Sequence, residues 1–179
     1  MPNWCQGSLK VRGKLENIQK FIENGLELNV HEYNLKINDL VDRVIPTDEW
    51  LKKDIYGDNT IHYYGSTSSF NFCTIWVRDS HRAFVDFMEI TPLICSTDSN
   101  NALYYTYMSV KQAWEIRSED WLAIAKKYDL DIRLDGIESG AGFTQTVEII
   151  NGEITVDEIT DYKNYADFIW NCPLPWIGG

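Results

Sequence analysis

The segment FTQTVEIINGEITV, residues 143–156, carries the clearest structural signal in the chain. Two runs rich in β-branched residues flank Asn151-Gly152, and an Asn-Gly pair readily adopts the two positive φ angles of a type I′ turn. In the register that this turn sets, two apolar pairs face each other: Ile149 with Ile154, and Val147 with Val156. The segment therefore predicts a β-hairpin.

Regular elements are expected on both sides of this hairpin. Apolar alternation, or enrichment in aromatic and β-branched residues, predicts strands over 8–13, 61–78, 102–110 and 131–138. Apolar residues spaced by three and four predict helices over 14–26, 79–90, 118–128 and 157–170. The polar residues 52–60 are interpreted as a loop.

The order strand, helix, strands, helix, strand, hairpin, helix is typical of an α+β fold. We expect an antiparallel sheet with helices on one face. More specifically, we expect a ferredoxin-like core with insertions and a C-terminal β-hairpin plus helix. No internal repeat or linker divides the sequence, so residues 1–179 are expected to form one domain. Residues 30–110 give the weakest pattern and are interpreted as an insertion region.

The overall charge excludes some classes of partner. The chain of 179 residues has 16 Lys and Arg against 27 Asp and Glu, a formal net charge of −11. Binding to duplex DNA or to anionic membranes needs a cationic surface, so both are disfavoured. No apolar run reaches the roughly 18–20 residues of a membrane span. Without a leader-like segment at its start, the protein is expected to be soluble and cytoplasmic.

The acidic residues are concentrated after residue 133. Residues 134–179 contain eight carboxylates and one cation, Lys163. Five of these carboxylates lie on the predicted hairpin and last helix: Glu148, Glu153, Asp157, Glu158 and Asp161. Carboxylates spaced in this way could imitate the phosphates of a nucleic acid and occupy a cationic groove on another protein. A solvated acidic surface that maintains solubility is the simpler interpretation.

Two blocks of sequence carry a family resemblance. The first is MPNWC at residues 1–5, LKVRG at 9–13 and a helix containing Phe21. The second comprises Ala113-Trp114, Trp121-Leu122, Ala125, Tyr128, Glu138, Gly142-Phe143 and Asn151-Gly152-Glu153. In these blocks the chain resembles the YubB-like family, small ferredoxin-like proteins encoded by phages, plasmids and integrative elements. The resemblance implies a ferredoxin-like fold and a mobile-element origin, and it implies no catalytic residue.

Together these observations favour a non-enzymatic protein that binds and inhibits a host nucleic-acid-handling defence system. The sharpest version is an anti-CRISPR protein whose five carboxylates occupy the cationic channel of a Cas effector. A plasmid or phage maintenance protein without inhibitory activity is a further hypothesis. No cofactor, no membrane and no direct duplex DNA binding are expected.

A nuclease acting on guide or other RNA is the alternative from a different class. Carboxylate oxygens are ligands for Mg²⁺, and Asp129, Asp131 and Asp135 are close in sequence, with Asp129 and Asp131 on one expected strand face. His62 and His81 could instead serve as the acid–base pair of metal-free RNA cleavage.

The remaining motifs have structural interpretations. The four cysteines, Cys5, Cys73, Cys95 and Cys172, lack the close spacing of zinc ligands, so reduced and mostly buried thiols are expected instead of a metal site. The glycine-rich residues 139–143 are not followed by the Lys of a P-loop and predict a tight turn between strands.

The aromatic residues Tyr104, Tyr105, Tyr107, Trp114 and Trp121 could stack on bases, as on an RNA-binding sheet. In an acidic chain, core packing or a protein-binding patch is the favoured interpretation.

Overall fold

The computed structural model describes residues 3–34, 39–55, 61–65, 73–85, 89–92 and 103–171. Its strands are β1 (Trp4–Gly13), β2 (Leu26–Asn34), β3 (Asp39–Ile45), β4 (Leu51–Ile55), β5 (Ile61–Gly65), β6 (Cys73–Val77), β7 (Ala83–Val85), β8 (Glu89–Pro92), β9 (Tyr104–Ala113), β10 (Asp131–Glu138), β11 (Phe143–Ile150) and β12 (Glu153–Asp161). The helices are α1 (Leu15–Gly25), α2 (Thr47–Trp50), α3 (Ser118–Tyr128) and α4 (Tyr165–Asn171).

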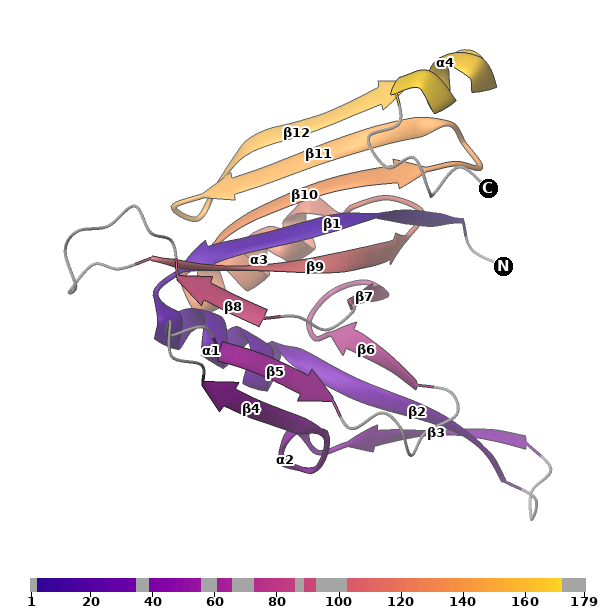
Figure 1. Cartoon of the computed structure of the whole chain (residues 1–179). Helices are drawn as coiled ribbons and strands as arrows, with labels where there is room; N and C mark the ends of the chain where they lie inside the picture. Colours follow the sequence, from indigo (N-terminus) through magenta and orange to yellow (C-terminus); the bar gives the residue numbers. More distant parts are fainter. Residues whose placement is uncertain are drawn as a thin grey trace.

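All twelve strands belong to one sheet, and its main path runs β12-β11-β10-β1-β9-β7-β6-β2-β3 (Figure 1). The pairings are antiparallel. The sheet divides at β9, because β7 pairs with one end of that strand and β8 with the other. From β8 a short branch continues through β5 to β4.

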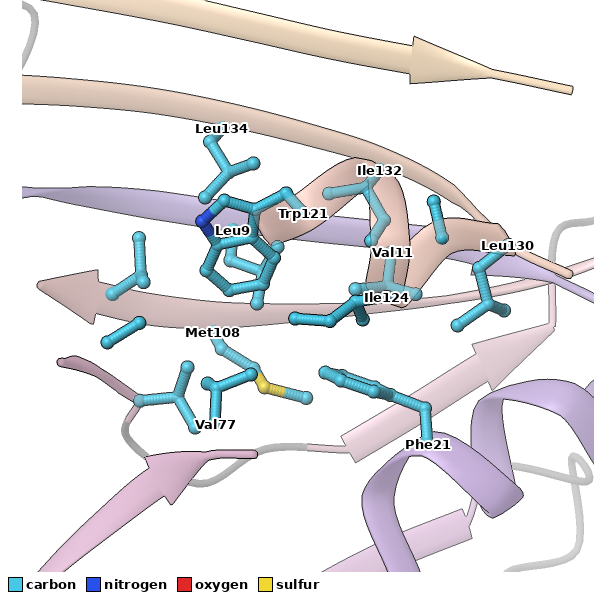
Figure 2. Close-up of a cluster of buried hydrophobic side chains, with 14 of the residues drawn as sticks. Leu9, Val11, Phe21, Val77, Met108, Trp121, Ile124, Leu130, Ile132 and Leu134 are labelled. Carbon is cyan, nitrogen blue, oxygen red and sulfur yellow. The ribbon is translucent and has the colours of Figure 1, made fainter. Parts of the chain in front are cut away.

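Helices α1 and α3 pack on one face of the sheet around the main core. Apolar side chains from neighbouring strands meet them there, and Figure 2 shows Leu9 and Val11 of β1 beside Ile132 and Leu134 of β10. The large side chains that the helices contribute to this cluster include Phe21, Trp121 and Ile124. Each fully buried side chain of this size stabilises the fold by about 1.5–3 kcal/mol, so this face anchors the sheet.

Local sequence accounts for the two long helices. In α1, the buried Ile18, Phe21 and Ile22 form one apolar stripe. Helix α3 has acidic residues in its first turn and basic residues in its last turn, an arrangement that the helix dipole favours. It ends at Asp129, which adopts the left-handed conformation with φ 53°.

A second, smaller core lies at the other end of the sheet. Leu28 and Val30 of β2, Ile45 of β3 and Trp50 of α2 are buried together. This cluster holds the short helix α2 against the outer strands.

The expected ferredoxin-like core is wrong. In a split βαβ unit, a single strand lies between the two strands that the helix joins. Here β1 and β2, which α1 connects, are separated by β9, β7 and β6. The physical reason is that residues 73–85, interpreted as part of an insertion, supply strands that enter the sheet between them.

The C-terminal part of the prediction is half correct. The hairpin is present, with Asn151 at φ 51° and Gly152 at φ 72°, and Ile149 does oppose Ile154. The helix expected from residue 157 is wrong, because β12 continues to Asp161 and α4 covers only Tyr165–Asn171. Ile159 and Thr160 prolong the strand by pairing with residues of β11.

Other local predictions divide in the same way. The helices at 14–26 and 118–128 and the strand at 131–138 are confirmed. The helix expected over 79–90 is wrong, since a turn at 78–82 leads into β7, and the loop expected over 52–60 is wrong where β4 runs. The strand β4 has no apolar face, because Lys52 and Lys53 are exposed while they pair with β5. The sequence pattern therefore did not indicate a strand.

No helix in the described part of the chain is long and apolar enough to cross a membrane.

Candidate functional site

Strand β12 forms one edge of the sheet (Figure 1). It pairs only with β11, and eight of its nine residues are exposed, the exception being the half-buried Val156. Among the described residues no strand pairs with its outer side. The strand therefore presents side chains on both faces together with an open backbone edge.

A β-bulge decides which face each carboxylate occupies. The register shifts between Glu148 and Ile149, so Val156 takes the place opposite Glu148 that Thr155 would otherwise hold. The hairpin sequence had predicted Val147 opposite Val156, and this pairing is wrong because Val147 lies opposite Asp157. One extra residue thus reverses the faces of the strand beyond the bulge.

The five predicted partner-binding carboxylates consequently divide between two faces. Glu148, Glu153 and Glu158 lie on the face turned away from α3, because their cross-strand neighbours alternate with the buried residues of β11. Asp157 lies on the α3 side, opposite the buried Val147, and Asp161 follows on the same side. On an edge strand both sets remain exposed, apart from the half-buried Glu148 on β11.

Two of the five carboxylates already have partners within the chain. Glu148 accepts a hydrogen bond from Arg133 at 3.2 Å and another from the Thr155 hydroxyl at 2.8 Å. Asp157 accepts one at 3.3 Å from the buried amide of Gln145. Glu153, Glu158 and Asp161 have no ion pair or side-chain hydrogen bond among the described residues. These three are the free charges of the edge.

The carboxylates of the alternative nuclease do not gather into one cluster. Asp129 ends α3 and binds the Asn17 amide at 3.1 Å, so it does not share a strand face with Asp131. Asp131 pairs with Arg12 at 2.7 Å, and Asp135 pairs with Arg133 at 3.1 Å. Across the described residues, no three His, Cys, Asp or Glu side chains are grouped as metal ligands.

The two histidines of the alternative lie on separate elements. His62 is in β5, on the branch that β8 joins to β9. His81 is in the turn between β6 and β7, where its backbone N–H donates to Asp120 at 2.7 Å. The two histidines are therefore placed on different parts of the sheet, and the side chain of His62 is not among the described side chains.

The glycine-rich turn is built around a buried acid. Glu138 is 2% exposed, and its carboxylate accepts hydrogen bonds from the backbone N–H groups of Gly140 and Ala141. Gly142 has φ 77°, which the turn requires and a residue with a side chain would resist. The prediction of a tight turn over 139–143 is confirmed, and the arrangement is structural.

Cys5 lies next to this turn and is a free, buried thiol. Burial, with a smaller contribution from the negative charge of Glu138, raises the pKa of Cys5 from 9.0 to about 12. The thiol therefore stays protonated, which makes Cys5 a core residue and not a nucleophile.

A basic and aromatic group lies on the face of β9, β1 and β10 that is turned away from α1 and α3. Tyr105 and Tyr107 of this group had been considered as stacking residues, but the basic residues beside them were not predicted. Lys10 of β1 lies directly opposite Tyr107 of β9 and Arg133 of β10. Arg12 lies opposite Tyr105 in the same way. The alternation of apolar and charged residues over 8–13 was a signal for the exposed side of β1. The registers that bring the tyrosines beside it are long-range and could not be seen.

Comparisons with protein-family models, with curated proteins and with solved structures find no match to this chain.

Proposed function

We propose that the protein binds, through strand β12, a cationic nucleic-acid-binding groove on another protein, and thereby inhibits it. The observation that carries this proposal is an exposed edge strand with three unpartnered carboxylates, Glu153, Glu158 and Asp161. Nothing else on that strand opposes the charge, because β12 contains no Lys or Arg.

The dimensions of the strand suit such a groove. Each residue of an extended strand advances about 3.3 Å, so Glu153 to Asp161 span roughly 26 Å. That length would follow a groove that holds several nucleotides. Because the side chains leave β12 on both faces, carboxylates would reach both walls of a groove that takes in the edge.

The identity of the partner class rests on the resemblance to the YubB-like family. A mobile-element protein gains from blocking host systems that recognise foreign nucleic acid, and a Cas effector is the sharpest candidate. Such effectors hold nucleic acid in positively charged channels, which matches the charge of β12. The proposed site of action is the host cytoplasm.

The direct test measures target-DNA binding and cleavage by purified Cas effectors loaded with guide RNA, with and without this protein. The parent chain should inhibit at least one effector, and the variant Glu153→Lys/Glu158→Lys/Asp161→Lys should not. A matched control is Asp48→Lys/Glu49→Lys/Asp54→Lys, which makes the same change of charge at exposed residues of α2 and β4. Inhibition that survives the β12 reversal would overturn the proposal.

A second measurement separates partner binding from protection of the edge. Charges on edge strands also prevent pairing between copies of a protein. If protection is the whole role of β12, the neutral variant Glu153→Gln/Glu158→Gln/Asp161→Asn will self-associate in light scattering while no effector responds to the parent. If the proposal is correct, the reversed variant loses inhibition while remaining monodisperse.

A further inference from the structure

We infer that a groove at the end of β1 and β10 binds single-stranded nucleic acid, a function separate from the proposed role of β12. The groove is formed by two adjoining depressions that share Arg12 and Asp131. Their volumes are about 370 Å³ and 270 Å³. Joined at this ion pair, they run from the end of α3 around the sheet end and onto its uncovered face.

The lining of the groove is cationic despite the negative charge of the whole chain. Five cations line it, Lys10, Arg12, Lys14, Lys126 and Arg133, against three carboxylates, Asp129, Asp131 and Glu148. Among the described residues, Lys10, Lys14 and Lys126 have no ion pair, so three positive charges are available to a ligand. A polyanion would therefore be attracted along the whole length of the groove.

The ion pairs inside the groove hold its shape. Asp131 receives two hydrogen bonds from Arg12, at 2.7 and 3.0 Å, and one from the backbone N–H of Asn151 at 3.0 Å. Arg133 is fixed by Asp135 and Glu148, and the hydrogen bond to Asp135 raises the pKa of Arg133 further. These contacts join the ends of β1 and β10 to the hairpin turn.

Two exposed tyrosines stand beside the cations. Tyr105 lines the second depression and is 38% exposed, and Tyr107 is 43% exposed. They are two residues apart on β9, so both lie on the same face, separated by about 7 Å along the strand. Their cross-strand neighbours are Arg12 and Lys10. Aromatic rings beside a cationic path are the arrangement on which bases of single-stranded nucleic acid stack.

A single strand fits this surface better than a duplex. Bases of a duplex are stacked on each other and would not reach the tyrosines. A duplex would also extend toward Glu153 and Glu158 of β12, which would repel its phosphates. A single strand that follows β1 and β9 keeps its phosphates near Lys10 and away from that edge.

The test is fluorescence anisotropy with a labelled single-stranded RNA of mixed sequence, a DNA strand of the same sequence, and the corresponding duplex. The parent should bind the single strands more tightly than the duplex. Since three free cations are available, log K should fall with log salt with a slope of about −2. The variant Lys10→Glu/Lys126→Glu should weaken binding at least tenfold. Its control, Lys20→Glu/Lys52→Glu, changes exposed lysines of α1 and β4 and should bind like the parent.

The tyrosines provide the specific part of the test. Tyr105→Ala and Tyr107→Ala should each weaken binding about tenfold, because stacking on one base contributes about 1–3 kcal/mol. Tyr105→Phe and Tyr107→Phe should retain binding, since the ring is kept. The variant Glu153→Lys/Glu158→Lys/Asp161→Lys should bind RNA at least as well as the parent. Its RNA binding therefore tests the groove independently of the proposed role of β12.

Three results would overturn the inference. The first is no binding by the parent at low salt. The second is unchanged affinity in Lys10→Glu/Lys126→Glu. The third is complete competition by polyglutamate together with unchanged affinity in both Tyr→Ala variants, which would mean that the groove attracts any polyanion, an acidic peptide included.

Discussion

Strands β10 and β12 lie on either side of β11, yet their carboxylates have different roles. On β10, Asp131 and Asp135 pair with Arg12 and Arg133 on the exposed face. The alternate residues Ile132 and Leu134 point into the core. On β12, Glu153 and Glu158 have no such partner among the described residues. The difference shows that the position of a strand in the sheet, and not its acidity, determines whether its charges stabilise the fold or remain available for binding.

The largest expected difference between the two strands is in packing. Leu134 of β10 is 0% exposed, and Leu134→Ala should lower the free energy of unfolding by about 2–5 kcal/mol. Ile154 of β12 is 38% exposed, and Ile154→Ala should cost less than about 1.5 kcal/mol. Urea denaturation followed by tryptophan fluorescence measures both. Equal losses would mean that β12 is buried in solution.

A second difference concerns the cost of forming a charge beside β10. Cys5 lies opposite Glu138, and burial raises the pKa of Cys5 from 9.0 to about 12. Below pH 9 the thiol is protonated in both the folded and the unfolded chain. Above pH 9 the unfolded chain loses this proton and the folded chain keeps it, so stability falls as the pH rises from 9 to 12.

At pH 10 this loss should reach about 1.4 kcal/mol. The measurement compares urea denaturation of the parent and of Cys5→Ala from pH 7 to pH 10 under reducing conditions. The parent should lose its advantage over Cys5→Ala as the pH rises, because groups common to both chains cancel. If the stability of both chains changes equally with pH, burial does not raise the pKa of Cys5 and the assignment is wrong.

The smallest expected difference is in the ion pairs. Asp131→Asn removes the charge that Arg12 binds and should cost about 0–1 kcal/mol, less at high salt, because both side chains are partly exposed. Glu158→Gln should leave stability unchanged or raise it slightly, because it removes one of several like charges from β12. Thermal unfolding at two salt concentrations tests both. A larger loss for Glu158→Gln would mean that the edge charge has a partner within the fold.

The elements that the sequence predicts correctly are those with local signals. The Asn151-Gly152 turn, the apolar stripe of α1 and the charge pattern of α3 each lie within a dozen residues. Beyond Val156, strand β12 lacks such a signal, because a strand exposed on both faces needs no alternation of apolar and polar residues. Ile159, Tyr162, Ala166 and Ile169 then happen to match helical spacing, which explains the wrong helix at 157–170.

The sequence predicted which acidic residues belong to the candidate site, but not how they are arranged. The five acidic residues were identified, but the bulge at Glu148 decided which of them share a face, and a bulge has no reliable signature in one sequence. The groove could not be predicted, because Lys10 precedes Tyr107 and Arg133 by about a hundred residues and meets them only through the register of the sheet. The net charge of −11 disfavoured a nucleic-acid-binding groove, because net charge adds together surfaces that lie apart in the fold.

The pairing of β1 also has a consequence for biosynthesis. Residues Trp4–Gly13 find their sheet neighbours in β9 and β10, and Cys5 pairs with Gln112 and Glu138. At a translation rate of about 5–20 residues per second, roughly 5–20 s pass between synthesis of β1 and synthesis of β9. During that interval Leu9 and Val11 have no strand partner, and the apolar stripe of α1 is the nearest surface that can shelter them. The sheet can therefore close on both sides of β1 only after Asp131–Glu138 has been synthesised.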